Sequence, residues 1–209
     1  MSHEYDDGSL EAERAREDMA RAAILPVRRD HFRKARLAGQ VRRVVAAGTR
    51  NGIAYADMHR TLDAGLRLWG LRAEDVEIIS GACPGEFSAD AHAMSWAKNF
   101  AVPAHQEPAD WSQGRSAGPR RNGKLAAWAA EGPTGGFLAV AWDGKSRGSM
   151  SMMKEAAGRG LHIHIGLVGR LTAEVAVGLV KLMTLWREPD TTDKGPRTSV
   201  PLSIEVYET

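Results

Sequence analysis

Residues 140–149 hold the side chains of this chain best suited to binding an anion. They read Val-Ala-Trp-Asp-Gly-Lys-Ser-Arg-Gly-Ser, after an apolar run from residue 136 and before a stretch of helical periodicity at 150–157. This order predicts a strand, a tight turn and the start of a helix. The first amides of a helix lack partners within it and lie at the positive end of its dipole. We therefore expect an anion to bind among Asp143, Gly144, Ser146, Arg147, Gly148 and Ser149.

Two earlier turns have the same character. A β-branched run at 41–48 ends in Gly-Thr-Arg, and the run 76–80 ends in a glycine-bounded turn at 81–85. Each turn alone is equally typical of an ordinary connection between a strand and a helix. The carboxyl ends of parallel strands share one edge of a sheet, however, so the three turns together predict a single binding edge. These two turns add to the predicted site Gly48, Thr49, Arg50, Ser80, Gly81 and Gly85.

The loop at 106–119 supplies further cations. Pro119 suits the first turn of a helix predicted at 120–130, and loops of this length in compact domains often carry function. Guanidinium groups bind phosphate through paired N–H donors. We expect this loop and the helix after it to reach the same edge with Arg115, Ser116, Arg120, Arg121 and Asn122.

Apolar runs and helical stretches alternate along the chain. The predicted strands are 41–48, 76–80, 102–105, 137–142, 161–165 and 199–207, and the predicted helices are 55–70, 88–100, 120–130, 150–159 and 172–187. The alternation predicts an α/β fold, namely a Rossmann-like, mostly parallel sheet with right-handed crossovers and helices on both faces. We divide the chain into an extension, 1–40, and a domain, 41–209, with its core at 41–165 and a C-terminal helix and strand at 166–209.

The extension is rich in charged residues, and the sign of its charge changes from negative to positive along its length. Its first twenty residues hold seven acids and two arginines, whereas seven arginines and lysines lie between residues 28 and 43. Pro26 is expected to end a first helix, and Gly39 a second. The two helices could neutralise each other, or the basic residues could bind a nucleic-acid backbone. We favour neutralisation, because no interleaved pattern of aromatic residues suggests base stacking.

Composition narrows the class of protein. The chain has 209 residues, 43% of them hydrophobic, and a formal net charge of +2, so it can bury a core and shows no overall bias toward nucleic acid. Its one cysteine, Cys83, excludes an intrachain disulfide and a multi-cysteine zinc site. No apolar run approaches the roughly 20 residues that span a bilayer, and the acidic first residues do not resemble a signal peptide. We expect a soluble, cytoplasmic protein with no membrane partner.

The ordered set of turns carries a resemblance. Val-Ala-Ala-Gly-Thr-Arg is followed by Ile-Ile-Ser-Gly-Ala-Cys-Pro-Gly with Asp90 downstream, then by Pro-Ala-Asp-Trp, Gly-Arg-Ser-Ala-Gly-Pro-Arg-Arg-Asn and Ala-Trp-Asp-Gly-Lys-Ser-Arg-Gly-Ser. Residues 41–165 thereby resemble the SLOG superfamily, and most of all its YspA/YpsA-related branch. The resemblance implies a Rossmann-like sheet that binds nucleotide-derived ligands, often as a homodimer. Related members are the LOG phosphoribohydrolases, which release a base from a nucleoside monophosphate, and the DNA-processing DprA proteins.

One departure from the LOG pattern bears on catalysis. The LOG enzymes carry Gly-Gly-x-Gly-Thr-x-x-Glu, whose glutamate is catalytic. Aligning Gly148 and Ser149 with its Gly-Thr puts Met152 at the glutamate position, and methionine cannot act as a general acid or base. The arginine-bearing helix of the family is matched by Arg120 and Arg121, so the binding half of the site is kept. The candidates for the missing acid are Glu155, Asp143 and Asp90.

Several other residues admit two interpretations. Cys83 could be a nucleophile, but it is more typical of a small buried residue. His162 and His164 point to one face of a strand, where they could bind a metal, although no third ligand is evident and a structural pair is favoured. Asp143 could bind a ribose or form an Asx turn, and Trp111 could stack on a base or pin its loop. We assign no metal and no cofactor beyond a nucleotide-type ligand.

The sequence therefore predicts a protein that binds a nucleotide-derived ligand at the C-terminal edge of its sheet, as a sensor or a processing protein. The ligand could be a nucleoside phosphate, NAD, ADP-ribose or a nucleotide sugar. One alternative is an N-glycosidic phosphoribohydrolase acting on nucleoside 5′-monophosphates. Another is a DprA-like protein that binds single-stranded nucleic acid through the basic residues at 28–43 and the sheet edge, which we favour less.

Overall fold

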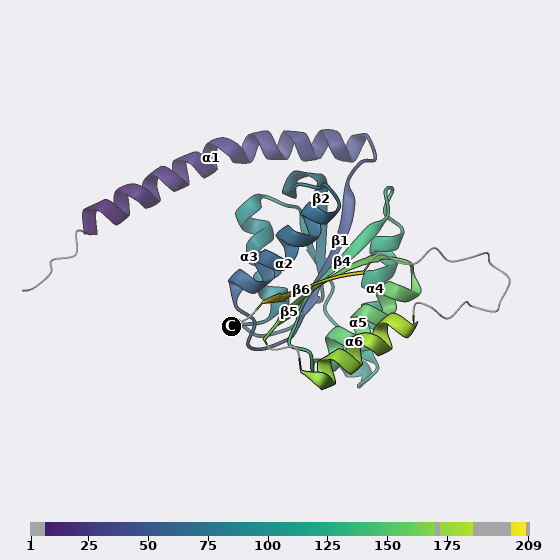
Figure 1. Cartoon of the computed structure of the whole chain (residues 1–209). Coiled ribbons are helices and arrows are strands. Elements are labelled where there is room, and N and C mark those ends of the chain that lie inside the picture. The colour runs from purple at the N-terminus through teal and green to yellow at the C-terminus, as the bar shows by residue number, and fades with distance from the viewer. Residues whose placement is uncertain (1–6, 170–171, 186–201, 208–209) are drawn as a thin grey trace, which may run out of the picture.

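The structure is a computed structural model that describes residues 7–169, 172–185 and 202–207. Six strands form one sheet in the order β3-β2-β1-β4-β5-β6, and every neighbouring pair is parallel (Figure 1). The Rossmann-like α/β fold is therefore confirmed, with a sheet that is parallel throughout. The strands are β1 (Arg42–Gly48), β2 (Val76–Ser80), β3 (Ala104–Gln106), β4 (Gly136–Trp142), β5 (His162–Val168) and β6 (Leu202–Tyr207).

Helices cover both faces of the sheet (Figure 1). Two pack on one face and three on the other, as the two apolar clusters of the core show. The first group is α2 (Tyr55–Leu68) and α3 (Ala89–Phe100). The second group is α4 (Ala117–Ala130), α5 (Arg147–Gly158) and α6 (Ala173–Leu185). Two short 3-10 helices complete the domain: η1 (Ala73–Asp75) and η2 (Trp111–Gln113).

Two helices begin earlier than the sequence predicts. α4 begins at Ala117 rather than at residue 120. α5 begins at Arg147 rather than at residue 150, because the Ser146 side chain accepts the N–H of Ser149 at 3.3 Å and caps the helix. Gly148 and Ser149 therefore belong to the first helical turn of α5 and not to the turn before it.

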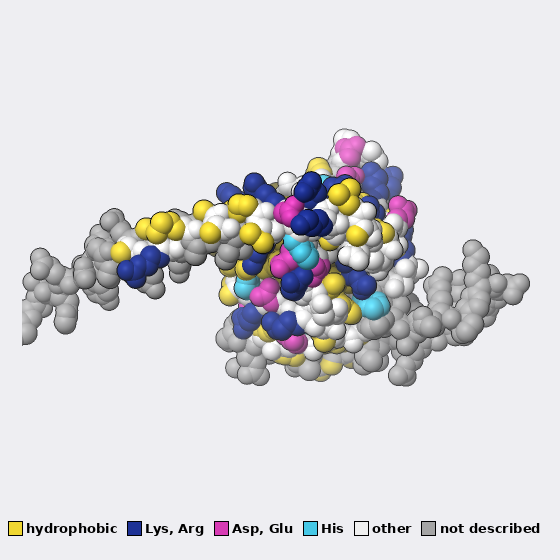
Figure 2. Space-filling model, turned by 90° about the horizontal axis from the view of Figure 1, so that it is seen from above, with side chains coloured by type: hydrophobic (Ala, Val, Ile, Leu, Met, Phe, Trp, Pro, Cys, Tyr) yellow, Lys and Arg dark blue, Asp and Glu magenta, His cyan; other side chains and the backbone are white. Residues whose placement is uncertain are grey.

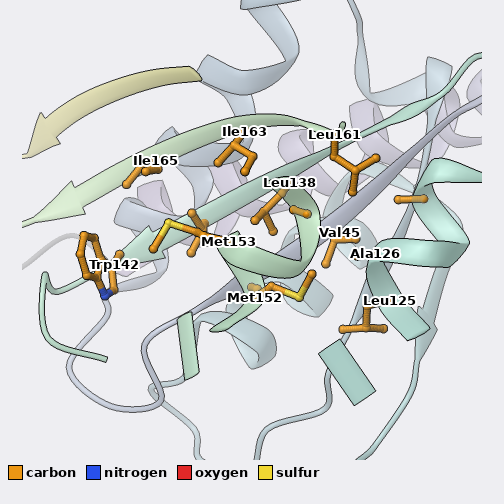
Figure 3. Packing of buried hydrophobic residues seen from close by; sticks show 14 of the residues in the cluster. Val45, Leu125, Ala126, Leu138, Trp142, Met152, Met153, Leu161, Ile163 and Ile165 are labelled. Atoms are coloured by element: carbon orange, nitrogen blue, oxygen red, sulfur yellow. The ribbon is translucent and has the colours of Figure 1, made fainter. Parts of the chain in front are cut away.

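The core consists of two apolar clusters, one on each face of the sheet. Alternate strand residues enter opposite clusters, so that Val45 and Leu138 face α4 and α5, whereas Val44 and Phe137 face α2 and α3. Figure 3 shows Met152 of α5 within the first cluster, beside the strands. Strands buried on both faces consist of nearly continuous apolar residues, and this is why β1 and β4 are recognisable in the sequence.

The extension forms one helix, α1 (Asp7–Leu37), which projects from the domain (Figure 1). The predicted helix end at Pro26 is wrong, because α1 continues through that residue. The helix is exposed there, so water can bind the carbonyl that the missing proline N–H leaves without a donor. A single helix also cannot fold back on itself, so the expected pair of mutually neutralising helices is not formed.

The C-terminal part of α1 is anchored to the domain. His31 Nε2 lies 2.9 Å from Asp75 Oδ1, and Arg28 Nη1 donates to the Phe100 carbonyl at 3.3 Å. Positive and negative side chains are interspersed over this end of the domain (Figure 2). Arg43, at the start of β1, pairs with Glu77 at 2.9 Å. Much of the basic stretch is therefore used in contacts within the chain.

The strand order reverses direction between β1 and β4. From β1 the chain proceeds to β2 and then β3 on one side, and from β4 it proceeds to β5 and β6 on the other. In open parallel sheets this switch point opens a crevice at the carboxyl ends of the two central strands, where ligands bind. Thr49 closes the base of the crevice: its N–H donates to the Ala141 carbonyl at 2.9 Å, and its Oγ1 accepts the N–H of Asp143 at 3.1 Å.

Candidate functional site

A pocket of about 490 Å³ lies at the switch point. All three glycine turns and the start of α4 contribute to its wall, although Gly48 and Ser149 are 101 positions apart in the chain. The three turns that the sequence predicts at one edge thus share this cavity. The predicted site residues that line it are Gly48, Arg50, Gly81, Asp90, Arg121, Asn122, Ser146, Arg147, Gly148 and Ser149.

The other predicted site residues lie behind or beside this pocket. Ser80 is buried, and its Oγ accepts the N–H of Ala82 at 3.4 Å. Arg120 turns away, because its Nη2 donates to the Gln113 carbonyl at 3.3 Å. Outside the pocket wall are Thr49, Ser80, Gly85, Arg115, Ser116, Arg120, Asp143, Gly144 and Glu155.

Asp143 positions the helix that borders the pocket. Its Oδ1 accepts the N–H groups of Lys145 at 2.9 Å and Ser146 at 2.8 Å, which is the geometry of an Asx turn. Gly144 has φ = 78°, and a Cβ there would overlap Val175 of α6. Of the two interpretations of Asp143, the structural one is present in the molecule: the turn fixes the direction in which α5 starts.

Two of the helices beside the pocket, α4 and α5, begin without the acidic residues that usually occupy the first turn of a helix. Acids near a helix N-terminus interact favourably with its dipole, and α2, α3 and α6 each carry one in their first turn. The first turns of α4 and α5 contain none. Instead α5 starts at Arg147, and Arg121 follows the first turn of α4. Positive charge is therefore concentrated where the two helices meet the pocket, and neither helix contributes an acid from its first turn to compensate it.

Arg121 is held in place along one side only. Its Nε donates to Asn122 Oδ1 at 3.1 Å. Asn122 is buried, and its Nδ2 donates to Ser151 Oγ at 3.3 Å and to the Gly148 carbonyl at 3.4 Å, so α4 and α5 are linked at this point. Arg121 Nη1 is buried and has no acceptor among the described residues. A buried donor of a charged group without an acceptor is costly in a folded protein, and an anion in the pocket would supply one.

Asp90, Cys83 and Arg50 form a second polar group in the wall. The Cys83 N–H donates to Asp90 Oδ2 at 2.8 Å, and Arg50 Nε lies 2.9 Å from Cys83 Sγ. Burial raises the pKa of the Asp90 carboxyl, against the opposing effects of the Cys83 amide and of the positive charges on Arg121 and Arg50. Asp90 is therefore an acid whose proton is held more tightly than usual, inside a cationic pocket.

Of the three acids considered for catalysis, Asp90 alone lines this pocket. Glu155 Oε2 pairs with Arg159 Nη1 at 2.6 Å, outside the pocket wall, and Asp143 is engaged in its turn. Met152 is 2% exposed and contributes an apolar part of the wall. The pocket thus offers binding groups together with a single carboxyl group.

Some wall residues are not part of the predicted site. Trp111 lies at the rim and is 54% exposed, and a Cβ on Gly118 would come within 3.3 Å of its ring. The sequence singled out Trp111 as a residue that could stack on a base, but its position next to α4 depends on η2. Leu125 follows from no motif, since only the packing of α4 against α5 brings it to the pocket.

The two histidines of β5 lie elsewhere. His164 is fully buried beneath α2, with Nδ1 2.7 Å from Ser203 Oγ, and burial lowers its pKa. The ring of His162 lies against that of Trp69, with centroids 5.4 Å apart. Within the described ranges no three His, Cys, Asp or Glu side chains are grouped as metal ligands. There is likewise no described helix with the length and hydropathy to cross a membrane.

Comparisons of the chain with family models, with curated proteins and with solved structures found no match. We therefore assign the fold from the strand order alone, which is the Rossmann-like order of a fully parallel sheet. Since fold alone does not determine function, an account of activity depends on the pocket itself.

Proposed function

We propose that this protein binds a nucleotide-derived ligand in the switch-point pocket, through a phosphate group, as a sensor or a processing protein. The observation that carries the proposal is the excess of positive charge in the pocket wall. The wall contains three guanidinium groups, those of Arg50, Arg121 and Arg147, and one carboxyl group, that of Asp90. The free amides at the start of α5 add donors, and the open space beside Gly148 leaves room for an anion close to the backbone.

The shape of the pocket supports a nucleotide over a simple anion. Its volume lies within the range of about 300–1,000 Å³ that is typical of small-molecule sites. Ala47, Leu125 and Met152 form an apolar part of the wall, and the exposed Trp111 ring at the rim is suited to stacking on a base. The order of motifs that resembles the SLOG superfamily supports the same ligand class. The homodimer implied by that resemblance stays a prediction.

Titration calorimetry with AMP, NAD and ADP-ribose tests the proposal. We expect at least AMP to bind, and Arg121→Ala to weaken binding about tenfold or more, the effect of losing a charge-assisted hydrogen bond. Arg120→Ala is the matched control, because its side chain lies next in sequence but points toward Gln113. Binding of none of the three nucleotides, or equal losses for both variants, would contradict the proposal.

A second candidate function is hydrolysis of an N-glycosidic bond. It is favoured by one observation, namely that the raised pKa of Asp90 suits a general acid, which would give a proton to the departing base as water attacks the sugar. Incubation with nucleoside monophosphates should then release free base, and Asp90→Asn should abolish release while AMP still binds. If wild-type protein binds AMP without releasing base, the protein is a binding protein only.

The nucleic-acid alternative has less support from the geometry. Arg42 and Arg43 begin β1, whereas the pocket lies at the end of β1, so the basic stretch and the pocket are at opposite edges of the sheet. Arg33 and Lys34 both pair with Asp30. A single strand could not engage the two regions through a short contact.

A further inference from the structure

A second cavity lies on the other side of the α5 N-terminus. Its volume is about 480 Å³, close to that of the switch-point pocket, and it lies between α5 and α6. The two cavities share Ser146, Arg147 and Ser151 as wall residues. The first turn of α5 is therefore the divider between two adjoining cavities, and it presents polar side chains to both.

The second cavity is also cationic. Its wall includes Lys145, Arg147 and Lys154, and none of these three has a carboxylate within ion-pair distance in the described part of the chain. The one acid in the wall, Glu155, is already paired with Arg159 at 2.6 Å. Two of these cations, Lys145 and Arg147, lie at the positive end of the α5 dipole, where positive charge is unfavourable. Such charges persist at sites where an anionic ligand compensates them.

From the adjoining cavities we infer that the second one binds a second phosphate-bearing group of the same ligand, so that the ligand is a dinucleotide or a nucleoside diphosphate with a sugar attached. This inference rests on the proposed function and specifies its ligand class. One phosphate lies near Arg121 and the free amides of α5. The remaining part of the ligand passes over Arg147 and Ser151 and reaches Lys154.

A longer, polymeric ligand is less consistent with the surface. Glu155 of α5 and Gly178 of α6 both contribute to the wall of the second cavity. The basic residues near α1 lie at the opposite edge of the sheet and do not extend the cationic surface. Among the described residues, the two cavity walls together hold five cations: Arg50, Arg121, Lys145, Arg147 and Lys154.

Calorimetry with AMP and ADP-ribose tests the inference, because ADP-ribose is AMP with a second phosphate and ribose attached. ADP-ribose should bind wild-type protein at least about tenfold more tightly than AMP, the gain from one charge-assisted hydrogen bond. Lys154→Glu should remove that gain and leave AMP affinity within about twofold, because Lys154 is outside the switch-point pocket. Lys124→Glu, which changes an exposed lysine of α4 outside both cavities, should leave the affinity ratio unchanged.

The outcomes separate the two proposals. AMP binding with no gain for ADP-ribose, or a gain that survives Lys154→Glu, overturns the second subsite and leaves the proposed function standing. Failure of both nucleotides to bind overturns the proposed function and the subsite with it. Tighter binding of a short single-stranded oligonucleotide than of ADP-ribose overturns the assignment of a dinucleotide.

Discussion

The guanidinium of Arg121 lies against the backbone of Gly81, in the space that a Cβ on residue 81 would occupy. A side chain as small as that of alanine would therefore displace the guanidinium. Arg121 belongs to α4 and Gly81 to the turn after β2, so this contact joins two of the segments that form the pocket. A substitution at Gly81 can therefore move the Arg121 guanidinium without replacing any charged residue.

Gly81→Ala should weaken AMP binding about tenfold, as Arg121→Ala does, because the displaced guanidinium loses its alignment with the ligand. The melting temperature should change little, since the overlap is with the far end of a flexible side chain. Calorimetry and thermal unfolding measure the two effects. Unchanged AMP affinity in Gly81→Ala would show that Arg121 does not contact the ligand from this position.

Alkylation of Cys83 should block the pocket. Its thiol lines the cavity beside Arg50 and belongs to the single cysteine of the chain, so a label there is unambiguous. We expect saturating AMP to slow modification by iodoacetamide, as followed by mass spectrometry, and the modified protein to bind AMP at least about tenfold more weakly. Cys83→Ser should still bind AMP, because a hydroxyl can also accept the Arg50 N–H. Labelling at the same rate with and without AMP would place the ligand elsewhere.

Gly48 is needed for packing at the centre of the sheet. A Cβ there would overlap the Ala141 carbonyl and come within 2.6 Å of the Ala89 Cβ, both parts of fixed elements. Gly48→Ala should lower the free energy of unfolding by about 1–3 kcal/mol or more, as measured by urea denaturation. Gly158→Ala is the matched control: it lies in α5 with open space around its Cβ position, and should be neutral or stabilising by up to about 1 kcal/mol.

The stability of the fold should depend on pH through His164. Burial, assisted by the nearby Arg67 and opposed by Glu205, lowers its pKa below 6.5 in the folded state. Below pH 6.5 the unfolded chain therefore takes up a proton that the folded chain resists, so the free energy of unfolding should fall as pH drops from that value. Well above pH 6.5 both states are neutral at this position, and the histidine should contribute no slope.

His164→Asn should flatten this acid-side decline in denaturation curves measured on either side of pH 6.5, with a smaller slope remaining from His162, whose pKa is also lowered. Asp90 acts in the opposite direction, because its raised pKa lets the folded state take up a proton first as the pH falls toward 3.8. An H164N variant with the full wild-type slope would contradict this account.

Much of the fold follows from local sequence. The central strands are recognisable because both of their faces are buried. The helix predicted from residue 88 begins there because the Ser88 Oγ accepts the N–H of Ala91 and caps α3. Predictions from local sequence are wrong where the surroundings in the folded chain determine the bounds of a helix or strand. α1 continues through Pro26 because that stretch is exposed, and β3 is a short edge strand, displaced toward Gln106 from the position that its apolar residues predict.

The sequence predicts at which edge of the sheet the site lies, but it does not predict which individual side chains enter the pocket. Arg120 and Arg121 are neighbours in sequence, and successive helical positions are rotated by about 100°. Which of them enters the pocket therefore depends on where α4 begins, and the helix begins three residues before the predicted start. Similarly, Ser151 and Leu125 reach the wall only through the packing of α4 against α5, a contact that no short motif encodes.

Pro26 divides α1 into two mechanically distinct parts. The carbonyl of Ala22 has no amide donor four residues ahead, so the backbone is weakest between the anchored end near His31 and the projecting N-terminal turns. A force applied to the projecting end would bend this joint before it reached the sheet. The arm can therefore change its direction while the pocket at the far edge keeps its shape.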